Sequence, residues 1–178
     1  MKNRKLLYLL YASLFAALVF VATMIISIPT LTGGYVNIGD GLVLLCGWIL
    51  GPFWGALAAG IGSMLADLVG FPVYAIPTLI IKALMPLLAF YIAKLVKPLF
   101  RKRFVSYIVG GAVAELLMIT GYFVFEATFM GFGWGALASV LPNVMQGIVG
   151  VTVATVLMTL FDRTKLIEKV IRRSERKK

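Results

Sequence analysis

The chain has 178 residues, of which 61% are hydrophobic and 13% charged, and its formal net charge is +10. A water-soluble domain of this length cannot bury so much apolar surface, so the composition excludes a soluble globular protein and indicates a polytopic membrane protein. The single cysteine, Cys46, excludes an internal disulfide, and the absence of histidine removes the commonest metal ligand and proton shuttle.

Sixteen of the 17 Lys and Arg residues fall in three clusters, Lys2–Lys5, Lys94–Arg103 and Arg163–Lys178. Basic loops of membrane proteins stay on the cytoplasmic side, so each apolar stretch between clusters is expected to cross the bilayer an even number of times. A crossing helix needs about 20 residues, so residues 6–93 fit four crossings and residues 104–161 fit two. The sequence therefore predicts an all-α integral membrane protein, a single domain of six transmembrane helices in the cell membrane, with both termini cytoplasmic.

Glycine and proline turns divide the apolar stretches, for example at Pro29, at Gly51-Pro52 and at Gly70. The predicted helices span about 6–28, 37–50, 53–69, 77–97, 104–127 and 135–161, and a basic cytoplasmic tail follows at 162–178.

Ala12 and Ala16 are four residues apart on the first predicted helix. Small residues at this spacing let two helices approach closely in lipid. Their shared face can pack inside the bundle or serve another subunit, and the spacing alone leaves both open.

The second predicted helix is short, since Asn37 to Leu50 is only 14 residues. At about 1.5 Å per residue it covers roughly 21 Å, less than the hydrocarbon core of about 30 Å. Because Gly51-Pro52 lies at the inner face in this topology, the deficit is expected on the outer side, beneath the loop 29–36. We hypothesise an outward-facing cavity lidded by this loop; a tilted helix or a locally thinned bilayer is the alternative.

Five ionisable residues lie in or at the edge of the apolar stretches: Asp40, Asp67, Lys82, Glu115 and Glu126. A charge near the bilayer centre costs about 3 kcal/mol, so each is expected to face protein or water. Asp67 and Lys82 flank the same predicted outer hairpin at similar depth, which predicts a structural ion pair, with direct ligand contact as the alternative. Asp40 is expected to cap the second helix or to anchor the loop.

The last two helices carry a polar face. Glu115, Tyr122 and Glu126 are spaced i, i+7 and i+11, so they project from one side of their helix. Asn143 and Gln146 lie one turn apart on the final helix. Acid, phenol and amide groups in an apolar, aromatic-rich setting predict a pocket for a small ligand, although interhelical hydrogen bonding alone would explain the two amides.

The sequence lacks the GxxxxGK[ST] phosphate loop and the GxSxG nucleophile elbow. We therefore expect no enzyme, no catalytic residues, no metal site and no cofactor in this chain.

Several segments together resemble the S component, the substrate-binding subunit, of an energy-coupling factor (ECF) vitamin transporter. They are Ala12-x-x-x-Ala16, the Gly-Asp ending of Tyr35–Asp40, the Gly-Pro ending of Leu50–Pro52, the Ala-Asp ending of Gly60–Asp67 and the Ile-Lys ending of Thr78–Lys82. The ordered Gly-Asp, Gly-Pro, Ala-Asp and Ile-Lys series is similar to the riboflavin-type branch, which includes proposed pyridoxine and hydroxymethylpyrimidine carriers.

The resemblance implies a subunit that captures a small B vitamin or precursor in an outward pocket and delivers it inward with a transmembrane coupling protein and two cytosolic ATPases, which use the ATP. It also implies that Ala12 and Ala16 dock onto the coupling protein. The substrate-binding residues expected here are Glu115, Tyr122, Glu126, Asn143, Gln146, Asn37 and Lys82. The Asp-Phe-Ser-Asp and Lys-Asn pattern of well-known riboflavin carriers is absent, so pyridoxine or hydroxymethylpyrimidine is the expected substrate and riboflavin a further alternative.

Two other classes of protein remain open from the sequence. A self-sufficient channel or proton-coupled transporter would use Glu115 or Glu126 as its carrier group and would show flux without partners. A purely structural membrane subunit would bind no ligand at all.

Overall fold

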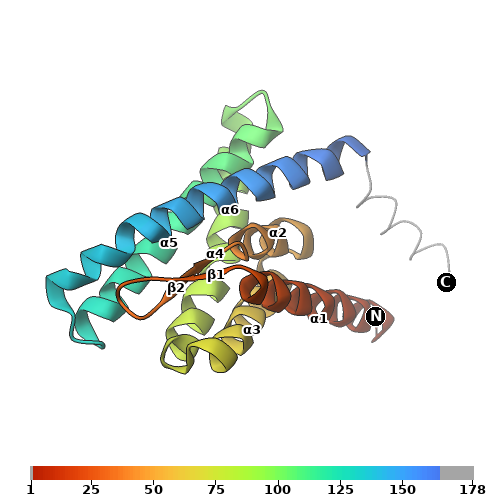
Figure 1. The fold of residues 1–178 in the computed structure, drawn as a ribbon. Coiled ribbons are helices and arrows are strands. Elements are labelled where there is room, and N and C mark those ends of the chain that lie inside the picture. The colour runs from red at the N-terminus through yellow and green to blue at the C-terminus, as the bar shows by residue number, and fades with distance from the viewer. Residues whose placement is uncertain (1, 165–178) are drawn as a thin grey trace.

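The computed structural model describes residues 2–164, which form six α-helices, three short 3₁₀ segments and one two-stranded antiparallel sheet (Figure 1). In chain order the elements are α1 (Lys2–Ile25), β1 (Ser27–Pro29), β2 (Tyr35–Asn37), α2 (Asp40–Leu50), α3 (Pro52–Gly70), η1 (Pro72–Tyr74), α4 (Ala75–Val96), η2 (Lys97–Leu99), α5 (Arg103–Thr128), η3 (Gly133–Ala136) and α6 (Leu137–Thr164).

The predicted six-helix fold is confirmed. Within residues 2–164, five helical segments are long and apolar enough to cross a membrane, and α2, with 11 residues, is the short one. Its start lies at Asp40, later than expected, because Tyr35–Asn37 pairs as a strand. Of the predicted tail at 162–178, residues 165–178 lie outside the described residues.

The short helix α2 lies at the centre of the bundle and packs against α1, α3, α4 and α6. Val43, Leu44 and Cys46 are fully buried. Close approach to α4 depends on Gly47, because a Cβ there would lie 2.9 Å from the Cα of Pro86. The short helix α2 is therefore a buried element of the bundle core, including its first residue, Asp40.

The predicted loop after the first helix is a β-hairpin. Ser27 pairs with Asn37 and Pro29 with Tyr35. The turn is closed by a hydrogen bond from the Thr30 amide to the Gly34 carbonyl (2.8 Å), and Gly33 adopts a positive φ of 81° that favours glycine. Figure 1 shows this hairpin extending from the end of α1 across the bundle toward α5. Its hydrogen bonds to the helices are described below.

Helix α1 packs mainly against α3, and Ala12 belongs to the buried core. Ala12 is 5% exposed. The Cα of Ala16 lies 3.1 Å from the position that a Cβ on Gly62 would occupy. The structure thus uses this small-residue face for packing inside the bundle, and leaves Leu14 and Leu18 of α1 exposed.

Substituting Gly62 by alanine tests this close contact. A Cβ at Gly62 would meet the main chain of Ala16, which cannot move aside as a flexible side chain can. We expect Gly62→Ala to lower the free energy of unfolding by about 1–3 kcal/mol, measured as a loss of melting temperature in detergent. Gly70→Ala is the matched control in the same helix, because nothing lies within 4 Å of its added Cβ. Equal stability of the two variants would contradict the α1–α3 packing.

Candidate functional site

A buried ion pair joins α2 to α4. The Lys82 ammonium contacts the Asp40 carboxylate, and the two side chains are 3% and 1% exposed. The expected pairing of Lys82 with Asp67 is corrected by this geometry. The sequence placed Asp40 at the outer edge of the bundle, whereas its contact with Lys82 places it at the depth of Lys82. Asn37, expected to begin the second helix, belongs to strand β2 instead.

Gln146 of α6 extends the ion pair to the hairpin. Its side-chain amide donates to Oδ2 of Asp40 (2.6 Å), and its carbonyl oxygen accepts from the main-chain amide of Asn37 (2.6 Å). The Asn37 side chain accepts in turn from the Gly39 amide (2.8 Å). One glutamine therefore fixes both the end of β2 and the acidic partner of Lys82.

Tyr35 of β2 donates a hydrogen bond to Asp67 of α3. Burial, and then the nearby charge of Asp67, raises the pKa of the Tyr35 phenol. Tyr35 consequently keeps its proton and remains a donor, which gives Asp67 a partner from the hairpin in place of Lys82.

Glu126 of α5 receives two hydrogen bonds on the same oxygen. Thr32, in the hairpin turn, donates to Oε1 at 3.1 Å, and Tyr74 of η1 donates to it at 3.0 Å. The second carboxylate oxygen, Oε2, is buried without a hydrogen-bond partner among the described residues.

These contacts attach the hairpin to three separate helices. Thr32 is bound to α5 through Glu126, Tyr35 to α3 through Asp67, and Asn37 to α6 through Gln146. Each helix residue is buried. The hairpin is thus held over the bundle interior by polar bonds, and it can open only if these bonds break.

Tyrosines form the aromatic part of the site. Tyr122 and Thr78 share a hydrogen bond of 2.8 Å, and the Lys82 ammonium lies 5.7 Å from the centre of the Tyr122 ring. The rings of Tyr74 and Tyr122 are 6.2 Å apart and tilted. Flat, electron-rich faces beside a cation suit the binding of a small aromatic ring.

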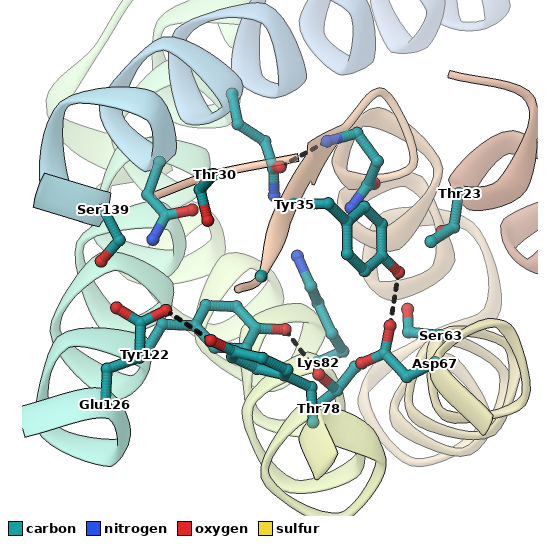
Figure 2. Close-up of a pocket in the computed structure, with 15 residues that line it drawn as sticks. Thr23, Thr30, Tyr35, Ser63, Asp67, Thr78, Lys82, Tyr122, Glu126 and Ser139 are labelled. Carbon is teal, nitrogen blue, oxygen red and sulfur yellow. Dashed lines mark hydrogen bonds between the residues drawn. The ribbon is translucent and has the colours of Figure 1, made fainter. Parts of the chain in front are cut away.

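The hairpin and these side chains enclose a cavity of about 20 Å³ (Figure 2). It is lined by Thr23, Thr30, Gly34, Tyr35, Asn37, Ser63, Asp67, Tyr74, Thr78, Lys82, Tyr122, Glu126, Ser139, Asn143 and Gln146. That volume holds roughly one ordered water, so the hairpin or the lining side chains must move to admit a larger ligand.

Six of the seven sequence-predicted binding residues line this cavity: Tyr122, Glu126, Asn143, Gln146, Asn37 and Lys82. Glu115 is not among the lining residues. It lies two helical turns from Tyr122 along α5, packed against Gly147 and Gly150 of α6, and is 3% exposed. Neither of its carboxylate oxygens has a hydrogen-bond partner among the described residues. The structure therefore places Glu115 beside Asp40, behind the cavity wall.

Sequence reasoning missed the hydroxyl groups that complete the lining, chiefly Ser63, Tyr74 and Thr78. A signal was present for two of them. Ser63 precedes Asp67 by four residues and Thr78 precedes Lys82 by four, so each shares a helix face with a charged residue already identified. Tyr74 lies in η1, where no helical spacing points to it.

Removing the cation of the buried pair is expected to destabilise the chain strongly. Lys82→Met leaves Asp40 buried and unpaired, which costs about 3–5 kcal/mol, and Asp40→Asn combined with Lys82→Met should recover part of this loss. Arg103→Met is the control, because Arg103 pairs with Asp162 at 3.3 Å with 56% of its side chain exposed, and such surface pairs contribute little. Melting temperatures in detergent measure all three; a Lys82→Met protein as stable as Arg103→Met would show that the buried pair is unimportant.

Comparisons with known proteins agree with this architecture. The chain is 28% identical over 171 residues to the thiamine precursor transporter HmpT of Lactococcus lactis, covering 94% of this chain and 95% of HmpT. It is 31% identical over 136 residues to an uncharacterised protein of Pyrococcus woesei, covering 76% of this chain and 88% of that protein.

Two solved structures share the fold. The S component of a bacterial ECF transporter superposes with a TM-score of 0.63 at 21% identity, covering 95% of this chain and 99% of that chain. The S component for biotin from an ECF-type ABC transporter gives a TM-score of 0.59 at 18% identity, covering 91% and 94%. The model of one sequence family, described as the ECF-type riboflavin transporter S component, matches residues 4–163. The resemblance predicted from the sequence is thereby confirmed, and the chain belongs to the ECF-type riboflavin transporter S-component family.

Proposed function

We propose that this S component captures a pyrimidine precursor of thiamine in the cavity beneath the hairpin. The observation that carries the proposal is the cavity itself, which combines three tyrosines, a cation and buried acceptors within a small volume. A single heteroaromatic ring bearing amino and hydroxyl groups complements such a lining, and it requires less movement of the hairpin and the lining side chains than the three fused rings of riboflavin. The relationship to HmpT along almost the whole chain supports the same substrate class.

In this proposal the ring lies against Tyr122 and Tyr74, with the polar groups of Asn37, Asn143 and Gln146 at its edges. Lys82 serves mainly to hold Asp40 and to present positive charge to the tyrosine face. Glu115 would act on the ligand only indirectly, through its neighbour Asp40.

Inward delivery is assigned to partners, as the family implies: a transmembrane coupling protein and two cytosolic ATPases. The chain has no phosphate loop of its own. The basic clusters at residues 94–103 and 163–178 would face the cytoplasm. Docking through Ala12 and Ala16 remains a prediction, and it requires α1 to move within the bundle, because Ala12 is buried and Ala16 lies against Gly62 of α3.

Ligand binding by the isolated chain is the first test. We expect hydroxymethylpyrimidine at 100 times its dissociation constant to stabilise the purified chain by about 2.7 kcal/mol, readable as a rise in melting temperature. Pyridoxine, riboflavin and thiamine complete the panel. Liposomes containing this chain alone should show no flux of the bound compound. Flux without partners would instead support a self-sufficient transporter. If no compound of the panel raises the melting temperature, the proposed substrate class is wrong.

The hairpin contacts predict how quickly ligand leaves. Tyr35→Phe removes the donor to Asp67 and should weaken closure of the hairpin by about 1–3 kcal/mol. We expect release of bound ligand, followed by stopped-flow fluorescence, to accelerate roughly tenfold or more. Tyr107→Phe is the matched control, since Tyr107 also donates to an aspartate, Asp162 (2.9 Å), but lies outside the cavity lining. Equal release rates in the two variants would show that the hairpin does not gate the site.

A further inference from the structure

Two of the cavity-lining residues carry a buried polar atom that lacks a hydrogen-bond partner within residues 2–164. These atoms are Oε2 of Glu126 and the hydroxyl oxygen of Ser63. A buried polar group left unpaired is destabilising, so such atoms are uncommon in folded proteins and point to a missing partner. Both residues line the cavity beneath the hairpin.

Glu126 is arranged so that one oxygen is engaged and the other is free. Thr32 and Tyr74 both donate to Oε1, and the residue is 2% exposed. An ionised carboxylate has only acceptor positions, so a hydrogen bond to Oε2 must come from an N–H or O–H donor. Figure 2 shows the Glu126 carboxylate near Ser139, with the hydrogen bond to a tyrosine hydroxyl leaving from one oxygen and the other oxygen on the opposite side.

The other two carboxylates near the cavity differ from Glu126. Asp40 binds Lys82 through Oδ1 and Gln146 through Oδ2, and Asp67 accepts from Tyr35 through Oδ1. Among the described residues that line the cavity, Glu126 is the carboxylate with a fully buried oxygen that lacks a hydrogen-bond partner.

Ser63 lies on the opposite side of the cavity. It belongs to α3 and Glu126 to α5, and α4, which packs against both helices, lies between them. In Figure 2, Ser63 is beside Asp67 at one side and Glu126 is beside Ser139 at the other. A ligand that satisfies both atoms must therefore carry polar groups at two ends of a flat body.

We infer that Glu126 selects the ligand by accepting a hydrogen bond from an amino group on its ring, while Ser63 binds a hydroxyl group at the far end. The inference rests on the proposed function and narrows it to amino-substituted heteroaromatic rings with a hydroxymethyl arm. An amino group on the ring offers two N–H donors, and one of them can donate a hydrogen bond to Oε2.

The test pairs ligand analogues with variants of the full chain. The ligands are 4-amino-5-hydroxymethyl-2-methylpyrimidine, the same pyrimidine with hydrogen in place of the amino group, and the same pyrimidine with methyl in place of hydroxymethyl. Dissociation constants are measured by calorimetry. The unsubstituted protein should prefer the amino compound over its des-amino analogue by about 10- to 100-fold, since a hydrogen bond to a charged acceptor is strong.

Glu126→Gln keeps the shape of the side chain but removes the charge and adds a donor. We expect the preference for the amino group to fall to within a few-fold, while the preference for the hydroxymethyl arm remains. Ser63→Ala should weaken the preference for the hydroxymethyl arm and keep the preference for the amino group. Thr155→Val is the matched control, because it removes a buried hydroxyl that has no hydrogen-bond partner among the described residues and does not line the cavity, and it should keep both preferences.

If Glu126→Gln does not fold, Glu126→Asp tests the same point. The shorter side chain moves the carboxylate away from the ligand, so the preference for the amino compound should also be lost. An amino preference that survives in the Glu126 variants overturns this inference alone. A chain that binds the des-amino compound as well as the amino compound also overturns it. A chain that binds none of the pyrimidines instead overturns the proposed substrate class on which the inference rests.

Discussion

The ion pair between Lys82 and Asp40 is the constraint around which this multi-pass protein of the cell membrane is arranged. An isolated charge in the apolar interior is costly, so the cation of α4 requires an acidic partner at its own depth. That requirement holds the first residue of α2 inside the bundle. Gln146 then binds the free oxygen of Asp40 and the end of the hairpin, which ties α2, α4, α6 and β2 into one unit.

The binding cavity follows from the same arrangement. Because α2 begins at Asp40, the space above it is closed by a hairpin rather than by a continued helix. A hairpin exposes polar groups that an apolar bundle cannot satisfy unless its helices supply partners. Glu126, Asp67 and Gln146 supply them, and they also line the cavity. Groups that bind the closed hairpin are therefore the groups that a ligand meets, so closure and ligand recognition share the same atoms.

Much of this could be predicted from the sequence, because hydrophobic length, basic clusters and glycine-proline turns act locally. They indicated six helices, a short second helix and a polar face shared by Tyr122 and Glu126. The pairings could not be predicted in the same way. Lys82 bonds Asp40 rather than Asp67 because the pairing of the hairpin strands sets the depth of α2, and strand pairing leaves no helical period to detect. Likewise, helix spacing put Glu115 on the correct face but could not show where along α5 the cavity ends.

The position of α2 has a consequence for permeability. Its 11 residues, roughly 16 Å of helix, run from the cavity toward the other end of the bundle. Their side chains include the fully buried Val43, Leu44 and Cys46, packed among the surrounding helices. These apolar side chains block the path from the cavity to the other end of the bundle, even when the hairpin opens. The chain can thus take up a polar molecule into the cavity while these packed side chains separate it from the other end of the bundle, and passage beyond α2 requires the whole bundle, or α2 itself, to be displaced.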